Sequence, residues 1–326
     1  MSELRFNPMT GRWVTIAAER RYRPGDFMPR RLPIQVDLTR PCPFCPGNEE
    51  ETPPALETYG PHGRWLVRVV PNLYPAFSGR GSLDMVELGP LHRRAAATGI
   101  HEVVVFSPDH GASWADLSDV QAGLLMAAIR DRVEDHAVAH GVEYTQFIVN
   151  HGREAGASIE HPHGQLLGIP FVPGDLEDEL NGFRSFGPAP LLVATVEEEE
   201  RLGQRVVAAD DRVVALCPYW SGQAYEILLV PREPVAHVDR ASPADLVAVG
   251  RLLRDLLVRL RKVLGDVAYN IVLHSAPHRV DDPFHWHVHV LPQLITGAGF
   301  EQGTGVRINV VPPELVALQL CEAATT

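Results

Sequence analysis

The sequence is almost without lysine, has few cysteines and contains no long hydrophobic run. Of its 29 basic residues only Lys262 is a lysine, which we attribute to genome composition. The 41 acidic residues leave a net charge of −12, so a general nucleic-acid binder is not expected. No apolar stretch approaches the ~20 residues of a membrane-spanning helix, and the opening "MSELRFNPMTGRW" lacks a signal-peptide core. We therefore expect a soluble, cytoplasmic protein with no membrane partner.

The four cysteines are too few for a disulfide framework in a chain of 326 residues. Two of them, Cys42 and Cys45, form the motif CPFC. In a reducing compartment this spacing favours metal binding over redox chemistry. With 45% hydrophobic residues, the chain can bury one large core or two ordinary ones.

The order of the expected elements occurs twice along the chain. The first set comprises strand 101–110, helix 118–141, strand 144–152 and a strand carrying His161. The second set comprises strand 225–233, helix 242–265, strand 269–277 and strand 284–293. Val104 and Leu228 lie 124 residues apart, and His161 and His287 lie 126 residues apart. These nearly equal offsets predict an internal duplication rather than two unrelated histidine clusters.

We expect an α+β fold in which antiparallel strands form the sheet and helices pack on one side of it. The duplication divides the chain into an N-terminal half, 1–180, and a C-terminal half, 181–326. The charged segment "VEEEERLGQR" (196–205) is interpreted as a solvated hairpin or loop between the halves.

Each half ends in a strand with polar side chains at alternate positions. The stretch "SIEHPHGQLL" (158–167) carries His161, His163 and Gln165, and "HWHVHVL" (285–291) carries three histidines. Because alternate side chains of a strand point to the same face, each row forms one polar surface. Hydrogen-bonded core histidines are the alternative explanation, which this spacing disfavours.

These motifs resemble the galactose-1-phosphate uridylyltransferase family of the histidine-triad superfamily. The mark of that family is HPHGQ, here 161–165, where the related hydrolases have a third histidine. The resemblance covers most of the chain and includes "NPMTGRWVTI", "CPFCPGN", "VVVFSPDH", "VNHGREAGASIEHPHGQ", "PYW", "LHSAP" and "AGFE". It implies two histidine-triad-like halves: the first with a zinc site and the HPHGQ active site, the second with the HWHVHV strand and a sugar-binding loop.

The resemblance implies transfer of UMP from UDP-glucose to galactose 1-phosphate, giving UDP-galactose and glucose 1-phosphate. His163 matches the nucleophile of the family, and a neutral imidazole can attack phosphorus and later leave it. Gln165 would donate to the phosphoryl oxygens without shuttling protons, and Ser158 matches a serine that hydrogen-bonds the phosphate. Gly164 would permit close approach of the backbone to a ligand.

Two metal sites follow from the resemblance. The first is a structural zinc site, because its Cys₂His₂ set leaves no open position: Cys42, Cys45, His110 and His161. The second can hold iron or zinc: Glu179, His274, His287 and His289. Glu177 is an alternative carboxylate for the second site. A reduced CxxC motif and a packed histidine strand, both without metal, stay open as alternatives.

Further positions match substrate-binding residues of the family. They are Arg20, Arg23, Asn72, Asn150, Phe300 and Glu301. The two arginines would neutralise the sugar phosphate, with a solvated basic turn as the alternative. The sequence departs from the family at Leu73, where an aspartate is usual, and at 159–160, where Asn-Pro is usual. Ile295 replaces a lysine of the sugar loop. These departures leave the sugar and the base open.

Three functional classes therefore remain. The leading one is a UDP-glucose:hexose-1-phosphate uridylyltransferase. The second is a related phosphorylase or nucleotidyltransferase that acts on ADP-sugars or another sugar 1-phosphate. The third is a catalytically silent metal-binding scaffold, which the His163 and Gln165 pair disfavours. The resemblance, together with the sheet edge that each half exposes, also implies a homodimer in which loop 295–306 reaches the HPHGQ site of the partner.

Overall fold

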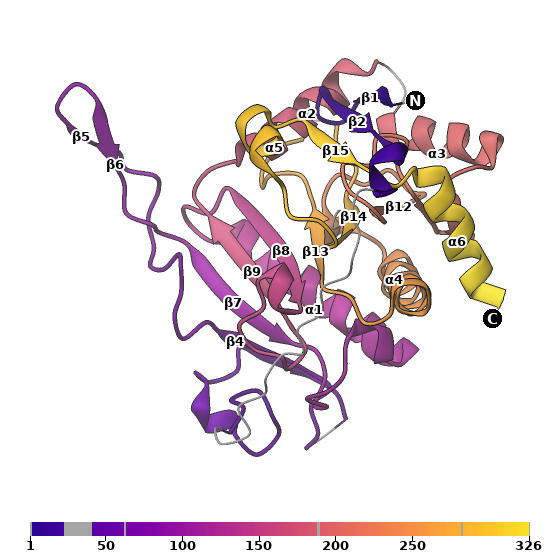
Figure 1. The fold of residues 1–326 in the computed structure, drawn as a ribbon. Helices are drawn as coiled ribbons and strands as arrows, with labels where there is room; N and C mark the ends of the chain where they lie inside the picture. The colour runs from indigo at the N-terminus through magenta and orange to yellow at the C-terminus, as the bar shows by residue number, and fades with distance from the viewer. Residues whose placement is uncertain (1, 23–40, 62, 188–189, 282, 326) are drawn as a thin grey trace.

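The structure is a computed structural model and describes residues 2–22, 41–61, 63–187, 190–281 and 283–325. The first half of the chain contributes β3 (Glu57–Tyr59), β4 (Val67–Pro71), β7 (Ile100–Val105), β8 (Tyr144–His151) and β9 (His163–Ile169). The second half contributes β10 (Val206–Ala209), β11 (Val213–Leu216), β12 (Ile227–Pro231), β13 (Tyr269–His274) and β14 (His287–Pro292). Together they form one ten-stranded antiparallel sheet in the order β10-β11-β12-β14-β13-β8-β9-β7-β4-β3 (Figure 1).

Helices cover both faces of this sheet. On one face lie α1 (Asp119–Val138), α4 (Pro243–Leu264) and α6 (Pro313–Thr325), packed on the larger hydrophobic core. Serines 118 and 242 cap α1 and α4, as the sequence predicts. Two further helices, α2 (Gly174–Ser185) and α3 (Leu191–Leu202), pack on the opposite face around a second core. The sequence predicted α1 and α4, but not α6, α2 or α3.

The expectation of a hairpin or loop at 196–205 is wrong, because most of this segment belongs to α3. The helix follows Pro190 and ends at Gly203, which adopts the left-handed conformation of a helix C-cap. Leu192 and Val196 are buried one turn apart. Glu197, Glu198 and Glu200 are exposed on the remaining faces, whereas Glu199 is buried and pairs with Arg205.

The two halves join through the pairing of β8 with β13, which places Asn150 opposite Asn270. His163 and His287 each begin the last strand that their half contributes to the large sheet, and each ring donates Nδ1–H to the carbonyl two residues before it, at 2.8 Å. These histidines are 124 residues apart, and the same offset relates β8 to β13. The offset from β7 to β12 is 125, because Val104 pairs with Gly164 and Leu229 with Val288, so Val104 corresponds to Leu229 rather than to Leu228. The expected boundary at residue 180 falls within α2 and stays a prediction.

A small sheet and a hairpin complete the fold. The small sheet contains β1 (Glu3–Asn7), β2 (Arg12–Ile16) and β15 (Arg307–Asn309), and β2 pairs with β15 in parallel. The hairpin of β5 (Val86–Leu88) and β6 (His92–Arg94) extends away from the body of the molecule (Figure 1). The described part of the chain contains no helix with the length and apolarity needed to cross a membrane. The short helix α5 (Gly299–Thr304) precedes β15.

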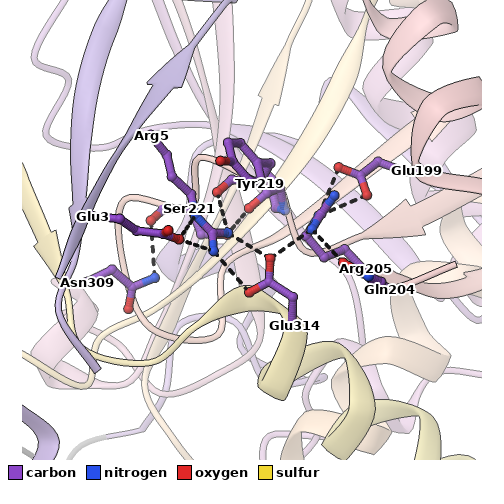
Figure 2. Close-up of polar contacts among 10 residues, drawn as sticks. Glu3, Arg5, Glu199, Gln204, Arg205, Tyr219, Ser221, Asn309 and Glu314 are labelled. Atoms are coloured by element: carbon purple, nitrogen blue, oxygen red, sulfur yellow. Dashed lines mark hydrogen bonds and ion pairs between the residues drawn. The ribbon is translucent and has the colours of Figure 1, made fainter. Parts of the chain in front are cut away.

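A network of charged side chains holds β1 against α6 (Figure 2). The Arg5 guanidinium donates to Glu314 at 2.8 Å and to the Tyr219 carbonyl at 3.0 Å. Arg205 donates to the same Glu314 at 2.8 Å and pairs with Glu199 at 2.9 Å. Both guanidinium groups also lie over the Tyr219 ring, 4.2 and 5.1 Å from its centroid. The "PYW" segment therefore supports the junction between the two ends of the described chain.

Candidate active site and metal centres

The two polar rows lie on one face of the sheet, opposite α1 and α4. In the strand register Gln165 is paired with Ile148, Ile148 with Val272, and Val272 with His289. Directly paired residues in antiparallel strands point to the same face. The neighbour of Gln165 in sequence, Leu166, points the other way into the core beneath α1. The duplicated strands thus place Gln165 and His289 in one row across the sheet.

His163 presents a free ring nitrogen to this face. The strand begins at His163, so His161 lies just before it rather than within it as expected. His163 donates Nδ1–H to the His161 carbonyl at 2.8 Å, which leaves the Nε2 lone pair available. Burial lowers the pKa of His163, although the bond to the carbonyl opposes this effect. The ring is therefore held in one orientation with its Nε2 lone pair unblocked, as a nucleophilic role would require.

A cavity of about 510 Å³ opens beside this ring, where the ends of β8, β9 and β13 meet. Its volume lies within the range of about 300–1,000 Å³ typical of small-molecule sites. Asn150, His161 and His163 contribute to its lining. Ser158 is exposed on the loop that precedes β9, and its neighbours Ala157 and Ile159 line the cavity. The structure thus brings Asn150 and the Ser158 loop close to His163.

The Gln165 side chain is held by a residue that the sequence analysis missed. Its Oε1 lies 2.8 Å from Nε2 of His101, and Asn72 Nδ2 lies 3.1 Å from the same ring nitrogen. His101 is in β7, opposite Leu167 of β9. The alternation of "IHEVVV" places His101 on the face of Val103, which pairs with Gln165, but no sequence signal indicates that pairing.

Gly164 is required for packing, which the sequence did not indicate, and the expected approach of a ligand to its backbone stays a prediction. A Cβ atom at this position would lie 2.7 Å from two ring carbons of Phe147 and 3.0 Å from the Ile148 carbonyl oxygen. Phe147 belongs to the core beneath α1. The missing side chain therefore leaves room for a core ring on the face away from the cavity.

The first predicted metal set is assembled. Ligand atoms of Cys42, Cys45, His110 and His161 all lie within 4.8 Å of one another. The Cys45 sulfur is 3.4 Å from Nδ1 of His110 and 3.6 Å from Nδ1 of His161. A tetrahedral zinc, with Zn–S ~2.3 Å and Zn–N ~2.0 Å, separates sulfur and nitrogen ligands by about 3.5 Å. The geometry of this set therefore fits zinc.

The protonation states in this set also favour a cation. His161 donates Nε2–H to the Ser107 carbonyl at 2.7 Å, so its Nδ1 carries a lone pair that faces Cys45. Burial, followed by the charge of Cys42, raises the pKa of the Cys45 thiol to about 11. Two neighbouring thiolates therefore need a positive charge between them.

The second predicted set is also assembled, from Glu179, His274, His287 and His289, within 4.8 Å. Glu179 accepts a hydrogen bond from Nδ1 of His274 at 2.9 Å. Burial opposes ionisation of Glu179, but His274 outweighs it and lowers the pKa of this carboxyl. Among the described residues, the buried Nε2 of His287 has no hydrogen-bond partner. One carboxylate and three imidazoles suit zinc or iron.

The remaining predicted residues lie elsewhere. Glu177, the alternative ligand, is exposed on α2. Phe300 and Glu301 are in α5, where Glu301 accepts from the Ala298 amide at 3.0 Å, and neither lines the cavity beside His163. Arg20 is in the 3₁₀ helix Ala18–Tyr22. Arg23 lies outside the described residues.

Known proteins resemble this chain over nearly its whole length. The family model "Galactose-1-phosphate uridyl transferase, N-terminal domain" matches residues 1–173, and a model of a domain of unknown function matches 113–325. The chain is 32% identical to an ADP-glucose phosphorylase of Arabidopsis thaliana, over 99% of this chain and 93% of that protein. It is 29% identical to a galactose-1-phosphate uridylyltransferase of Thermotoga maritima, over 99% and 98%.

A solved structure extends the likeness to three dimensions. It is a crystal structure of an ADP-glucose phosphorylase from Arabidopsis thaliana with bound ADP-glucose. Its TM-score to this structure is 0.82, at 30% identity, with 100% of each chain covered. The family match over more than half of the chain agrees with the full-length relatives. The chain is therefore an enzyme of the galactose-1-phosphate uridyl transferase family.

Proposed function

We propose that the protein transfers a nucleoside monophosphate from a nucleotide sugar to an acceptor phosphate through His163. The main support for this proposal is the orientation of the His163 ring. Its Nδ1–H donates to the His161 carbonyl, so its Nε2 lone pair is available, and the residue lines the cavity. Nε2 attacks the α-phosphorus, a phosphorus–nitrogen bond forms, and the bond to the departing sugar 1-phosphate breaks. An acceptor phosphate oxygen then attacks the same phosphorus, and the bond to His163 breaks.

The other site residues take the following parts in the proposal. The Gln165 amide and Ser158 donate to the phosphoryl oxygens, where charge spreads in the transition state. Asn72 and Asn150 contact the nucleotide. The sugar phosphate is bound by Arg20, Arg23, Phe300 and Glu301. Of the three that the structure describes, Arg20, Phe300 and Glu301, none lines the cavity of its own chain. We therefore propose a homodimer, in which loop 295–306 of the partner reaches the cavity.

The donor that the observations favour is an ADP-sugar, with orthophosphate as the acceptor and ADP as the product. The support is the whole-chain similarity to an ADP-glucose phosphorylase and to its structure with bound ADP-glucose. Leu73 adds to it, because an exposed apolar side chain stands where the resemblance places a polar aspartate. The second candidate is UDP-glucose with galactose 1-phosphate as acceptor, which the family match and the Thermotoga maritima relative support.

We propose zinc at the Cys₂His₂ set and iron or zinc at the set of Glu179. A closed Cys₂His₂ zinc is structural: it holds the backbone before β9 in place. Through His161 it would fix the carbonyl that orients His163. The thiolate ligands Cys42 and Cys45 agree with the expected cytoplasmic location, where thiols stay reduced.

The test separates the two half-reactions. The protein is incubated with ADP-glucose or UDP-glucose without acceptor, and sugar 1-phosphate and the mass of the intact protein are measured. We expect one sugar 1-phosphate per site and a gain of one nucleotidyl group on His163. The adduct should be labile in acid and stable in mild base, as a phosphorus–nitrogen bond is.

Addition of orthophosphate or galactose 1-phosphate then identifies the acceptor by the product formed. His163→Asn should lose both the burst and the adduct, whereas His92→Asn, on the exposed hairpin, should keep them. Turnover with intersecting-line kinetics and no adduct would exclude the double displacement. Bound zinc without any turnover would instead support the metal-binding scaffold.

A further inference from the structure

His101 makes the contact that decides which way the Gln165 amide points. The backbone N–H of Ala76 donates to His101 Nδ1 at 3.0 Å, so Nδ1 carries the lone pair. In a neutral imidazole the proton then lies on Nε2. Nε2 is 2.8 Å from Gln165 Oε1, which accepts that proton. The NH₂ group of Gln165 is thereby turned away from His101.

The neighbouring Asn72 does not compete for this proton. Its Oδ1 accepts from the Tyr74 amide at 2.9 Å, so its NH₂ group is the end that faces His101. An NH₂ group cannot accept a hydrogen bond from Nε2–H. Among the described residues, the acceptor for His101 Nε2–H is therefore the Gln165 carbonyl.

The orientation matters because the two ends of a glutamine amide have opposite effects on a phosphoryl group. The NH₂ end donates to the oxygens that gain charge in the transition state, whereas the carbonyl end repels them. The ends have nearly the same shape, so packing alone does not select between them. A fixed donor on the Oε1 side does select.

The duplication supports a role tied to Gln165. In the strand register Val103 pairs with Gln165 and Leu228 pairs with His289, so the residue of the second half that corresponds to His101 is Glu226. Where the second half has histidine in place of glutamine, it also has a carboxylate in place of the histidine donor, and Glu226 Oε1 lies 3.8 Å from Nδ1 of His289. Glu102, which follows His101, points to the opposite face and pairs with Arg132, so it takes no part in this contact.

We propose that His101 is a positioning residue that holds the NH₂ group of Gln165 toward the phosphoryl group in transit. The proposal rests on the transfer through His163 described above. His101 itself does not touch the phosphoryl group. The chain Ala76 N–H, His101, Gln165 fixes one amide orientation before the substrate arrives, which lowers the reorganisation required in the reaction.

The activity test is a double-mutant cycle on the rate of nucleotidyl-histidine formation. His101→Leu should slow this step about 10-fold with little change in KM, because the donor acts in the transition state. In a Gln165→Ala background the same change should have no further effect. His101→Gln, whose NH₂ group can replace Nε2–H, should recover most of the rate. His92→Leu is the matched control on the exposed hairpin.

The structural test does not depend on turnover. With ¹⁵N-glutamine labelling, the side-chain NH₂ signals of Gln165 are assigned by their loss in Gln165→Ala. They should shift in His101→Leu, return toward their wild-type positions in His101→Gln, and stay unchanged in His92→Leu. Unchanged signals in His101→Leu, or a rate loss that is equally large without Gln165, would overturn the positioning role. Absence of the adduct in the wild-type protein would instead refute the transfer through His163, and the labelling result would still decide the role of His101.

Discussion

Gly164→Ala tests whether the packing beneath β9 controls the nucleophile. The new Cβ would lie 2.7 Å from two ring carbons of Phe147, which is 1% exposed and cannot turn into solvent. Overpacking of this kind costs about 1–3 kcal/mol. For a chain of this size each kcal/mol lowers Tm by roughly 2 °C, so we expect a loss of about 2–6 °C.

The same change should reduce activity, because Gly164 lies between His163 and Gln165. Its backbone pairs with Val104 on one side and Val149 on the other, so β9 relieves the clash by moving relative to both neighbours. A displacement of ~1 Å at a reacting group can cost about 100-fold in rate. We therefore expect a 10- to 100-fold slower formation of the nucleotidyl-histidine, with about one zinc per chain retained.

A second substitution identifies the cause. Phe147→Leu removes the ring and should restore much of the rate of Gly164→Ala, although it lowers stability in the wild-type background. Gly174→Ala is the control, because a Cβ atom at position 174 would meet no atom of the described, non-adjacent residues within 4 Å. Circular dichroism melting and single-turnover mass spectrometry provide the two readouts. A Gly164→Ala protein with wild-type Tm and rate, or one that Phe147→Leu does not rescue, would refute the reasoning.

Three further outcomes are expected. Cys42→Ser should lose the tightly held zinc and lower Tm, since ligand loss removes binding energy coupled to folding; metal analysis showing wild-type zinc contradicts this. Burial opposes ionisation of Glu102, but His136 and then Arg132 outweigh burial and lower the pKa of this carboxyl in the folded protein. The ionised carboxylate therefore stabilises the fold above the unfolded pKa near 4.5, and this stabilisation is lost as pH falls through the lower folded pKa. Urea unfolding from pH 6 down to pH 3 should therefore show a shallower loss of stability in Glu102→Gln, by up to about 1.4 kcal/mol per pH unit, and equal slopes would contradict it. Light scattering should give twice the mass of one 35.9 kDa chain, and a fully active monomer would exclude the dimer.

Local signals predicted the elements that carry the site. The serine caps gave the starts of α1 and α4, and alternation gave the shared face of His163 and Gln165. The CxxC spacing indicated a metal set without showing its partners. His110 and His161 joined it only by resemblance, and the fold brings their rings to Cys45.

Contacts between distant strands could not be predicted. The ring that requires Gly164 comes from β8, and the donor that holds Gln165 comes from β7. Neither pairing leaves a periodic trace in the sequence, because strand order is set by the packing of the whole sheet. The helix α3 was missed for a different reason. Its glutamate run resembles a solvated loop, and the buried Leu192 and Val196 precede that run rather than interrupt it.

The network around Tyr219 sets the order in which the chain can finish folding during synthesis. Arg5 of β1 donates a hydrogen bond to Glu314 of α6, and β2 pairs in parallel with β15. Both partners of the first hairpin therefore lie near the other end of the chain. Asn7 and Arg307 are 300 residues apart, so a ribosome that adds about 5–20 residues per second needs roughly 15–60 s to supply the missing strand. Until then the edge of β2 that pairs with β15 has no partner strand, and chaperones have that interval in which to bind the first hairpin.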